Sequence, residues 1–563
     1  MKRLQHEQGY YKKKWTGRIP IALVFPNEYS VGMSNLGFLF LYQRLNSYEE
    51  IVCERVFFSK TDKPLSIESS RPLKDFRVIL FAIPFEVDFI NALKMLSNAG
   101  IPLSPENRDQ IVLAGGVAIT ANPTPLFPFF DGFFFGEWEE MEDAVVPLFL
   151  EWIDNKAKLI ESLNALPFFW TSHCSKEEVK KETPRFARGD KIVSRGDKIV
   201  ARGDKIGTPR GDTSSHQPKE EVKVAKVKSG FKPVVSYLIS EKAEFKNSYL
   251  IEVYRGCGRG CRFCLAGYLF RPPRAVDKIA LLEACKNLPE KGKVGLIGLE
   301  FADLSLLKEV WSILRTRSAT LTFSSIRAET ITEDFLPLLS TTRSIALAPE
   351  TASERLKKRV NKLIDNELIF KLLEMFKAVH LKKVKLYFMY GLPGETLEDL
   401  QENVKFIKRV VKSGYPYLFR FTFSPFVPKP HTPFQWANLP EIKELEEKEK
   451  FLKKELKGVG ELSFEPLKLA RIQALIARGN EETGLVISQN LTAPTSKLLK
   501  ALEEAKMEFK DRGSERFPWD FINTGVKKSY LYAEWKKSLL GIPTKTCRVG
   551  ECKTCSACSI LES

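Results

Sequence analysis

The second half of the chain alternates short apolar runs with helix-like segments, which restricts it to an α/β fold. The apolar runs from residue 248 onward are SYLIEVYRG, VGLIGLE, TLTFSSIRAE, RSIALAPE, VKLYFMYGLPGE and FRFTFSPFVP. Each run ends in a polar or Gly/Pro loop, as strands followed by helices do in a (β/α) barrel. We therefore predict a partial (β/α)6 barrel over residues 241–440, with its chemistry on the loops that follow the strands.

The first 170 residues show a second, separate alternation. Apolar runs at residues 21–25, 53–58, 78–83, 111–116 and 130–141 are separated by amphipathic stretches. This pattern predicts a doubly wound, Rossmann-like α/β domain over residues 1–170. Its ligand crevice is expected at the carboxyl ends of the strands, on residues 27–35, 84–88, 115–125 and 136–140.

Residues 171–240 interrupt the pattern with the repeat ARGDKIVSRGDKIVARGDKIGTPRGD. The repeat offers too little apolar surface to offset its ordering entropy, so we expect a linker here. Residues 441–563 open with the charged helical sequence EIKELEEKEKFLKKELK and end in a cysteine-rich tail. We expect this last region to be mostly helical.

Composition limits the class of protein. The 563 residues suffice for two to four domains, and 87 basic against 70 acidic residues give a net charge of +17. That excess suits an anionic partner such as RNA without requiring one. No apolar run approaches the roughly 18 residues of a membrane span, and the first residues lack the apolar core of a secretory signal. We therefore expect a cytoplasmic protein.

The loop after the first barrel strand carries the chemistry. Residues 254–265 read YRGCGRGCRFCL, which places Cys257, Cys261 and Cys264 in a CxxxCxxC spacing. Three thiolates can hold three irons of a [4Fe–4S] cluster and leave the fourth iron open to a substrate. A structural zinc site usually has four ligands, and no histidine lies near these cysteines. The spacing therefore favours an iron–sulfur cluster over zinc.

These residues resemble the radical SAM enzymes, in which the open iron chelates S-adenosylmethionine (SAM) and one electron cleaves it to a 5′-deoxyadenosyl radical. The resemblance implies cofactor contacts at Phe263, just before the third cysteine, and at Gly298 and Glu300. The last two stand where the family often has a Gly-Gly-Glu turn that meets the SAM amino group. Leu299 replaces the second glycine of that turn.

The same resemblance implies further site residues on the later strand ends. Glu350 would meet the ribose hydroxyls, with Arg355 as a carboxylate partner, although a helix cap or surface ion pair fits both equally well. Gly391 and Gly394, in MYGLPGE, would pack on adenine, and the alternative is a plain strand-to-helix turn. His431, in SPFVPKPHTPFQW, is a candidate catalytic acid, base or substrate contact, and its alternative is a structural role.

The amino-terminal domain resembles the cobalamin-binding-like domain fused to many radical SAM enzymes. PNEYSVGMSNLG, AGGVAITANPTP and GEWEE carry this resemblance. No histidine occurs between His6 and His173, so a DxHxxG-type cobalt ligand is absent. The domain would bind cobalamin without that ligand, or serve instead as a platform for substrate or RNA. Methylthiotransferases carry three cysteines in this domain, whereas this one has only Cys53, which disfavours their sulfur insertion.

The extreme end of the chain, CRVGECKTCSAC, holds a second group of thiols: Cys547, Cys552, Cys555 and Cys558. Four ligands can close a metal site completely. A second [4Fe–4S] cluster and a structural zinc ion both fit four such ligands, and the run of CxxC steps favours the cluster.

The leading hypothesis is a radical SAM enzyme of the branch with a cobalamin-binding-like domain, related to the methylthiotransferase-type enzymes. It would methylate or otherwise modify an unknown substrate, with RNA one candidate, and draw electrons from a reductant such as ferredoxin or flavodoxin. One alternative is a cobalamin-independent radical SAM enzyme that modifies tRNA or rRNA. Another is a non-catalytic iron–sulfur or zinc protein that binds nucleic acid.

Overall fold

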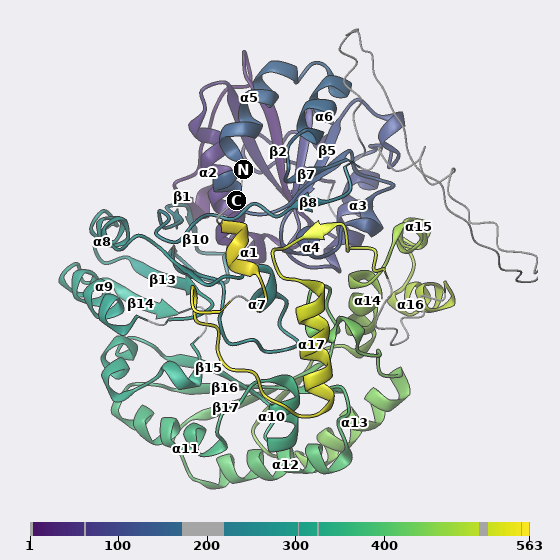
Figure 1. The fold of residues 1–563 in the computed structure, drawn as a ribbon. Coiled ribbons are helices and arrows are strands. Elements are labelled where there is room, and N and C mark those ends of the chain that lie inside the picture. Colours follow the sequence, from purple (N-terminus) through teal and green to yellow (C-terminus); the bar gives the residue numbers. More distant parts are fainter. Residues whose placement is uncertain are drawn as a thin grey trace, which may run out of the picture.

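The chain forms two α/β lobes, with the amino-terminal domain above the barrel in Figure 1. The computed structural model describes residues 4–60, 63–171, 219–301, 303–323, 326–505, 516–552 and 554–561. The RGDKIV repeats, which we expected to form a linker, lie outside these residues.

The amino-terminal lobe is built on a six-stranded sheet in the order β3-β2-β4-β5-β6-β7. The strands are β2 (Ile19–Phe25), β3 (Ile51–Phe57), β4 (Val78–Ala82), β5 (Ile111–Gly115), β6 (Gly132–Phe134) and β7 (Phe169–Trp170). Strands β2 to β6 run parallel and β7 is antiparallel. In chain order this is the flavodoxin-like arrangement 2-1-3-4-5, whose switch point lies between β2 and β4. The predicted doubly wound α/β class is confirmed.

Helices cover both faces of this sheet, which is why its strands are apolar along nearly their whole length. They are α1 (Tyr29–Gly32), α2 (Leu36–Ser47), α3 (Asp88–Asn98), α4 (Val117–Ala121), α5 (Glu142–Trp152) and α6 (Lys156–Asn164). The start of α2 follows from local chemistry, because the Asn35 side chain caps it by accepting a hydrogen bond from the Phe38 amide (2.9 Å).

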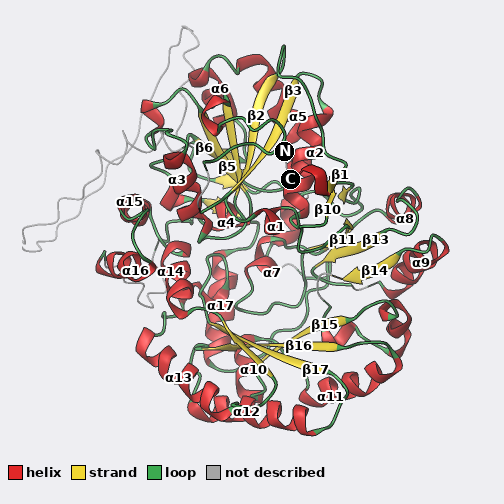
Figure 2. Cartoon of the chain, turned by 180° about the vertical axis from the view of Figure 1, so that it is seen from behind, coloured by secondary structure: helices red, strands yellow, loops and turns green. Residues whose placement is uncertain are grey.

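The six apolar runs predicted for the barrel all form strands, divided between two sheets (Figure 2). The first sheet has the order β12-β11-β13-β14, with β9 (Val235–Ser236) also paired to β11, and the second has the order β15-β16-β17-β18. Their bounds are β11 (Ser248–Arg255), β12 (Arg274–Ala275), β13 (Lys293–Gly298), β14 (Thr320–Phe323), β15 (Ser344–Glu350), β16 (Lys383–Tyr390), β17 (Leu418–Pro425) and β18 (Glu461–Phe464).

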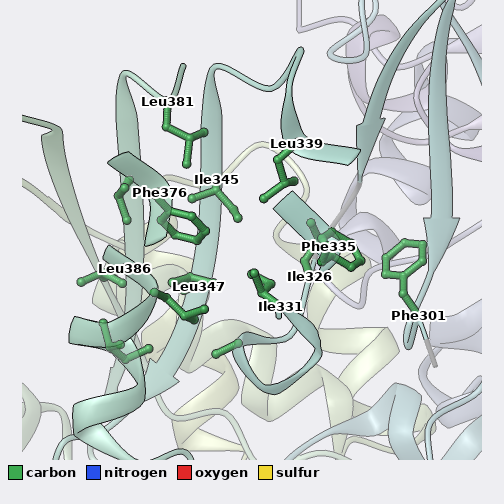
Figure 3. Packing of buried hydrophobic residues seen from close by; sticks show 14 of the residues in the cluster. Phe301, Ile326, Ile331, Phe335, Leu339, Ile345, Leu347, Phe376, Leu381 and Leu386 are labelled. Carbon is green, nitrogen blue, oxygen red and sulfur yellow. The ribbon is translucent and has the colours of Figure 1, made fainter. Parts of the chain in front are cut away.

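An outer layer of helices packs against the two barrel sheets. These helices are α8 (Lys278–Lys286), α9 (Leu304–Thr316), α11 (Asn366–Met375) and α12 (Leu397–Lys412). Helix α10 (Glu354–Val360) instead packs through Leu356 and Val360 in a separate buried cluster that also contains residues of the amino-terminal lobe. Apolar side chains fill the seam between the sheets (Figure 3): Phe335 and Leu339 belong to the same buried cluster as Ile345 and Phe376. One continuous core therefore joins the two half-barrels.

The carboxyl-terminal region is mostly helical, as predicted. It comprises α13 (Ile442–Glu455), α14 (Leu467–Ala477), α15 (Glu481–Gln489), α16 (Thr495–Glu504) and α17 (Lys528–Leu539). This region also contacts the amino-terminal lobe, since Asn122 Nδ2 donates to the carbonyl oxygens of Ala477 (3.1 Å) and Gly479 (2.8 Å). In the part of the chain that the structure describes, no helix is both long and apolar enough to cross a membrane.

Residues 219–240, expected as the end of the linker, are instead packed against both lobes. Strand β8 (Val222–Lys223) pairs with β19 (Ile522–Asn523), β9 pairs with β11, and β10 (Ile239–Ser240) pairs with β1 (Glu7–Gln8). The side chains of Val222, Val224 and Val227 are buried. These alternating valines give the segment the apolar surface that the repeats before it lack.

Candidate functional site

Strand β11 delivers the predicted cysteine loop. Gly256 turns the chain at a φ of +86°, and a Cβ there would lie 2.2 Å from the Phe270 carbonyl oxygen, so only glycine fits. Cys257 and Cys261 are 9% and 7% exposed, and Cys264 is half-buried at the start of α7 (Leu265–Leu269). The Cys264 amide donates to the Cys261 carbonyl (3.1 Å) and closes a tight turn. The three cysteines therefore share one compact, largely buried loop.

Burial dominates the electrostatics of two of these thiols, Cys257 and Cys264. It raises the pKa of Cys257, and it raises the pKa of Cys264 to about 11. Two cations act in the opposite direction: Arg327 acts to lower the pKa of Cys257, and Lys362 acts to lower the pKa of Cys264. Positive charge beside the loop favours thiolates, the form that binds metals.

Glu300 contacts the cysteine loop directly. Its buried carboxylate accepts hydrogen bonds from Arg259 Nε (2.9 Å) and from the Gly258 amide (3.4 Å). Gly298 is the last residue of β13, two residues before this carboxylate. Phe263 is half-buried and packs on the apolar cluster that joins the two lobes. The structure therefore gathers these three predicted residues on or beside the cysteine loop.

The remaining predicted contacts lie on the second barrel sheet. Glu350 ends β15 with a φ of +66°, unusual for a non-glycine residue, and pairs with Lys362 Nζ (2.8 Å). Arg355 forms an ion pair with Asp399 and donates a hydrogen bond to the Gly394 carbonyl (2.8 Å). These contacts match the alternative of an ion pair, and the predicted carboxylate contact to the cofactor stays a prediction.

Gly391 and Gly394 turn the chain after β16, at φ values of +74° and +71°. The Gly391 amide donates to the Glu395 carboxylate (2.6 Å), which holds the turn in place. This geometry suits a strand-to-helix turn, and the predicted adenine contact stays a prediction.

His431 is buried, with a φ of +53° and 7% exposure. Burial lowers its pKa to about 3, so the ring is neutral at physiological pH. Its Nε2 atom finds no partner among the described protein groups. A neutral imidazole can accept a proton or a hydrogen bond, and its catalytic role stays a prediction.

A cavity of about 390 Å³ lies between the two lobes. Residues 80–84, 115–117 and 136–139 line it from the ends of β4, β5 and β6, and Phe25 lines it from the end of β2. From the barrel it is lined by Val234, Glu252, Arg255, Phe270 and Ile297. This is the strand-end crevice expected from the topology, at the switch point between β2 and β4.

Asp88, beside this crevice, provides a test of pH dependence. It is fully buried, and Asn27 Nδ2 (2.9 Å) and Asn91 Nδ2 (3.4 Å) donate to its Oδ1 atom. Burial raises the pKa of Asp88 to about 7 against these hydrogen bonds. The folded state therefore holds a proton that the unfolded chain releases, and stability is lost as the pH rises from about 4 through about 7.

We expect Asp88→Asn to remove this loss and to stabilise the protein at about pH 8, by on the order of 4 kcal/mol. The variant should match the parent near pH 4. Melting temperatures across the pH range measure the difference. The exposed Asp75→Asn serves as control, and a parent–variant difference that is constant with pH would contradict the assignment.

The residues that fasten the cysteine loop to the rest of the protein were not predicted from the sequence. Arg262, fully buried between two of the cysteines, donates to the Glu534 carboxylate (3.1 Å) and to the Ile542 carbonyl (2.7 Å). Asn361 Nδ2 donates to the Gly260 carbonyl (3.1 Å), while its Oδ1 accepts from the Thr544 amide (2.8 Å). The only available signal was the position of this arginine, directly between two closely spaced cysteines.

The tail (residues 542–561) brings the second cysteine group to the first. The Cys547 amide donates to the Gly258 carbonyl (2.7 Å), and the Lys527 amide donates to the Cys555 carbonyl (3.1 Å). Cys555 is buried, Cys547 and Cys558 are half-buried, and Cys552 is exposed.

Two family models match the chain. A model described as the N-terminal region of radical SAM proteins matches residues 37–171, and the model of the radical SAM superfamily matches residues 251–407. An uncharacterized protein of Methanocaldococcus jannaschii is 28% identical over 516 residues, which cover 91% of this chain and 98% of that protein.

Two further similarities cover different parts of the chain. A tRNA-2-methylthio-N(6)-dimethylallyladenosine synthase of Anaplasma phagocytophilum is 26% identical over 229 residues, 36% of this chain and 49% of that enzyme. This chain thus spans about half the length of that relative. The cobalamin-dependent S-adenosylmethionine radical enzyme OxsB, solved with aqua-cobalamin and S-adenosylmethionine bound, aligns with a TM-score of 0.42 and 13% identity over 97% of this chain and 83% of that chain.

The cysteine loop at the end of β11 and the family matches define a radical SAM enzyme. The protein belongs to the radical SAM superfamily and is related to the methylthiotransferases. Both predictions are confirmed, and the alternative of a non-catalytic protein is set aside. Membership in the superfamily implies a [4Fe–4S] cluster and SAM as cofactors.

The residues present fit such a cluster by their chemistry. One loop supplies three largely buried thiols, and Arg327 and Lys362 place positive charge beside them. Among the described residues, no three Cys, His, Asp or Glu side chains are gathered closely enough to hold a metal ion as they stand. Cluster binding therefore requires the three thiols to turn toward a common centre.

Proposed function

We propose that this radical SAM enzyme is cobalamin-dependent and methylates, or modifies by related chemistry, a substrate that lies between its two lobes. One observation carries the proposal: the strand-end cavity is bordered by Arg255 and Phe270, which flank the cysteine loop on either side. A ligand in the cavity would therefore lie next to the radical-generating loop.

The cavity suits a mostly apolar group. Its walls include the side chains of Phe25, Phe81 and Phe134, and its volume of about 390 Å³ lies within the range of ordinary small-molecule pockets. No histidine or cysteine is found among the described residues that line it, so bound cobalamin would take no cobalt ligand from these walls. When bound, the cluster supplies the electron that cleaves SAM and cobalamin supplies a transferable methyl group.

Ion pairs between the two lobes hold them in fixed positions around the cavity. Glu137, after β6, pairs with Arg255 (3.0 Å) and Arg274 (2.8 Å) from the barrel, while Arg255 also pairs with Glu139 (2.8 Å) and Glu252 (2.6 Å). Burial acts to raise the pKa of Glu137, but Arg255 and Arg274 hold this pKa below its usual value. This network would fix the distance between the crevice and the loop, and the apolar walls would exclude water.

Cobalamin content tests the proposal. Protein purified without oxygen from cells supplied with hydroxocobalamin should contain near-stoichiometric cobalamin, read from its absorbance spectrum and confirmed by mass spectrometry. Iron without cobalamin would overturn the proposal and leave the amino-terminal domain as a substrate platform.

A cavity-filling variant locates the site. Ala82, at the end of β4, lines the cavity, and Ala82→Phe should lower cobalamin affinity by about tenfold through steric overlap. The matched control is Ala165→Phe, at an exposed position of the same domain. Equal retention of cobalamin by both variants would place the site elsewhere.

A second candidate is cobalamin-independent modification of tRNA or rRNA. The similarity to a tRNA-modifying synthase and the net charge of +17 favour it. It predicts SAM cleavage by cobalamin-free protein and a binding affinity for tRNA that falls steeply with salt. In both cases the electron would come from a carrier such as ferredoxin or flavodoxin.

A further inference from the structure

We propose that the tail binds a second [4Fe–4S] cluster through Cys547, Cys552, Cys555 and Cys558, and that this cluster lies beside the loop of the first. The inference does not depend on cobalamin or on the identity of the substrate. It rests on the spacing of the thiols, on the contacts that fix the tail, and on two buried cations that lack a counter-ion.

The spacing favours iron over zinc. The last three thiols follow one another as CxxCxxC, and the fourth, Cys547, lies five residues before Cys552. Three cysteines at two-residue intervals, completed by a fourth cysteine from outside this run, are typical of ferredoxin-type [4Fe–4S] sites. Structural zinc sites more often use two ligand pairs separated by a longer loop.

Contacts to three separate elements hold the tail in place. Its first part crosses the cysteine loop, where Arg262 holds the Ile542 carbonyl (2.7 Å), Asn361 holds the Thr544 amide (2.8 Å), and Gly258 holds the Cys547 amide (2.7 Å). Its second part rests on the start of α17 through the bond between Lys527 and Cys555. Figure 1 shows the yellow tail running from the foot of α17 back to the region between the lobes. The four cysteines thus lie on a positioned segment of chain.

Turns between the cysteines direct the chain back on itself. Gly550, between Cys547 and Cys552, has a φ of +83°, and Ser556, between Cys555 and Cys558, has a φ of +63°. Such turns let thiols that are near in sequence face one centre. As for the first loop, no three described thiols are close enough to share a metal as they stand, so the tail thiols must also converge on binding.

Two buried cations next to the tail lack a carboxylate partner. Arg271 is 3% exposed and donates to the Gly267 carbonyl (2.9 Å) and the Tyr530 hydroxyl (3.3 Å). Lys226 is 8% exposed and donates to the carbonyls of Arg271 (2.7 Å) and Thr524 (2.6 Å). Neither forms an ion pair with any carboxylate in the described part of the chain.

A buried charge without a counter-ion is costly, so an anion is expected close by. Both cations lie within electrostatic range of the Cys555 thiol, and Arg271 also acts on Cys547 and Cys552. A [4Fe–4S]²⁺ cluster with four thiolates carries two negative charges, which would offset the charge of Arg271 and favour the charged form of Lys226, whose pKa burial lowers to about 7. Zinc with four thiolates has the same net charge, so the charge does not distinguish the two metals. The choice of iron rests on the CxxCxxC spacing.

Iron and sulfide analysis of the anaerobically reconstituted full chain tests the proposal, with no SAM or cobalamin added. We expect about eight irons per chain, about four in the triple variant Cys552→Ala/Cys555→Ala/Cys558→Ala, and about four in Cys257→Ala/Cys261→Ala/Cys264→Ala. The buried, isolated Cys285→Ala is the matched control and should keep about eight. Because iron is counted without substrate, failure of the proposed function would leave this result unchanged.

The double variant Cys552→Ala/Cys558→Ala guards against misfolding, because these side chains are exposed and half-buried, and it leaves only two tail thiols, too few to hold the cluster. It should lose iron while its circular dichroism spectrum and gel-filtration volume match those of the parent. Three outcomes would overturn the proposal: about four irons in the parent, one zinc per chain that the tail variants lose, or an iron content that the tail substitutions do not change.

Discussion

Replacing Cys261 by alanine is expected to abolish SAM cleavage. The thiol lies on the turn between β11 and α7, between the other two cysteines, and no spare cysteine is available inside the loop. Loss of a residue that only orients a metal ligand typically costs about 10–100-fold, so loss of a direct ligand should cost at least about 100-fold. Formation of 5′-deoxyadenosine by the reduced, reconstituted protein measures the effect.

The matched control is again Cys285→Ala, which removes a buried thiol from α8, outside the cysteine loop. It should keep both its iron and its SAM cleavage. If Cys261→Ala formed 5′-deoxyadenosine at the parent's rate, the assignment of the catalytic loop would be wrong.

Removing Arg262 is expected to destabilise the protein strongly. The guanidinium is fully buried, and it bonds the Glu534 carboxylate and the carbonyls of Lys358 (3.0 Å), Arg359 (3.1 Å) and Ile542 (2.7 Å). Breaking a buried ion pair by removing one partner typically costs about 3–5 kcal/mol, because the other charge is left buried. Arg262→Ala should therefore lower the melting temperature by several degrees.

Two comparisons separate this effect from an ordinary loss of charge. Lys158→Ala breaks an exposed pair with Glu161 and should change stability by about 0–1 kcal/mol. The double variant Arg262→Met/Glu534→Leu removes both buried charges and should recover part of the loss. A melting temperature of Arg262→Ala equal to that of Lys158→Ala would show that the buried pair between the cysteine loop and α17 adds no more stability than an exposed pair.

The sequence alone predicts those features that depend on residues close together in the chain. The βα alternation predicted both lobes because the periodicity of apolar residues follows directly from strand and helix geometry. The cysteine loop was equally predictable, since its ligands and its turn glycine, Gly256, lie within eight residues of one another. The same reasoning placed the crevice on the ends of β4, β5 and β6, because parallel strands end at one edge of a sheet.

Other features depend on groups that are distant in sequence. The prediction of a linker over residues 219–240 was wrong. Their short strands pair with partners as distant as β1 and β19, and no local sequence pattern indicates such pairing. The cavity needs both lobes, and the role of Arg262 depends on Glu534, 272 residues away. The sequence by itself therefore determined the two lobes and the thiols. Only the tertiary structure decided that the tail lies on the cysteine loop, because hydrogen bonds and ion pairs between remote segments form only once the chain has folded.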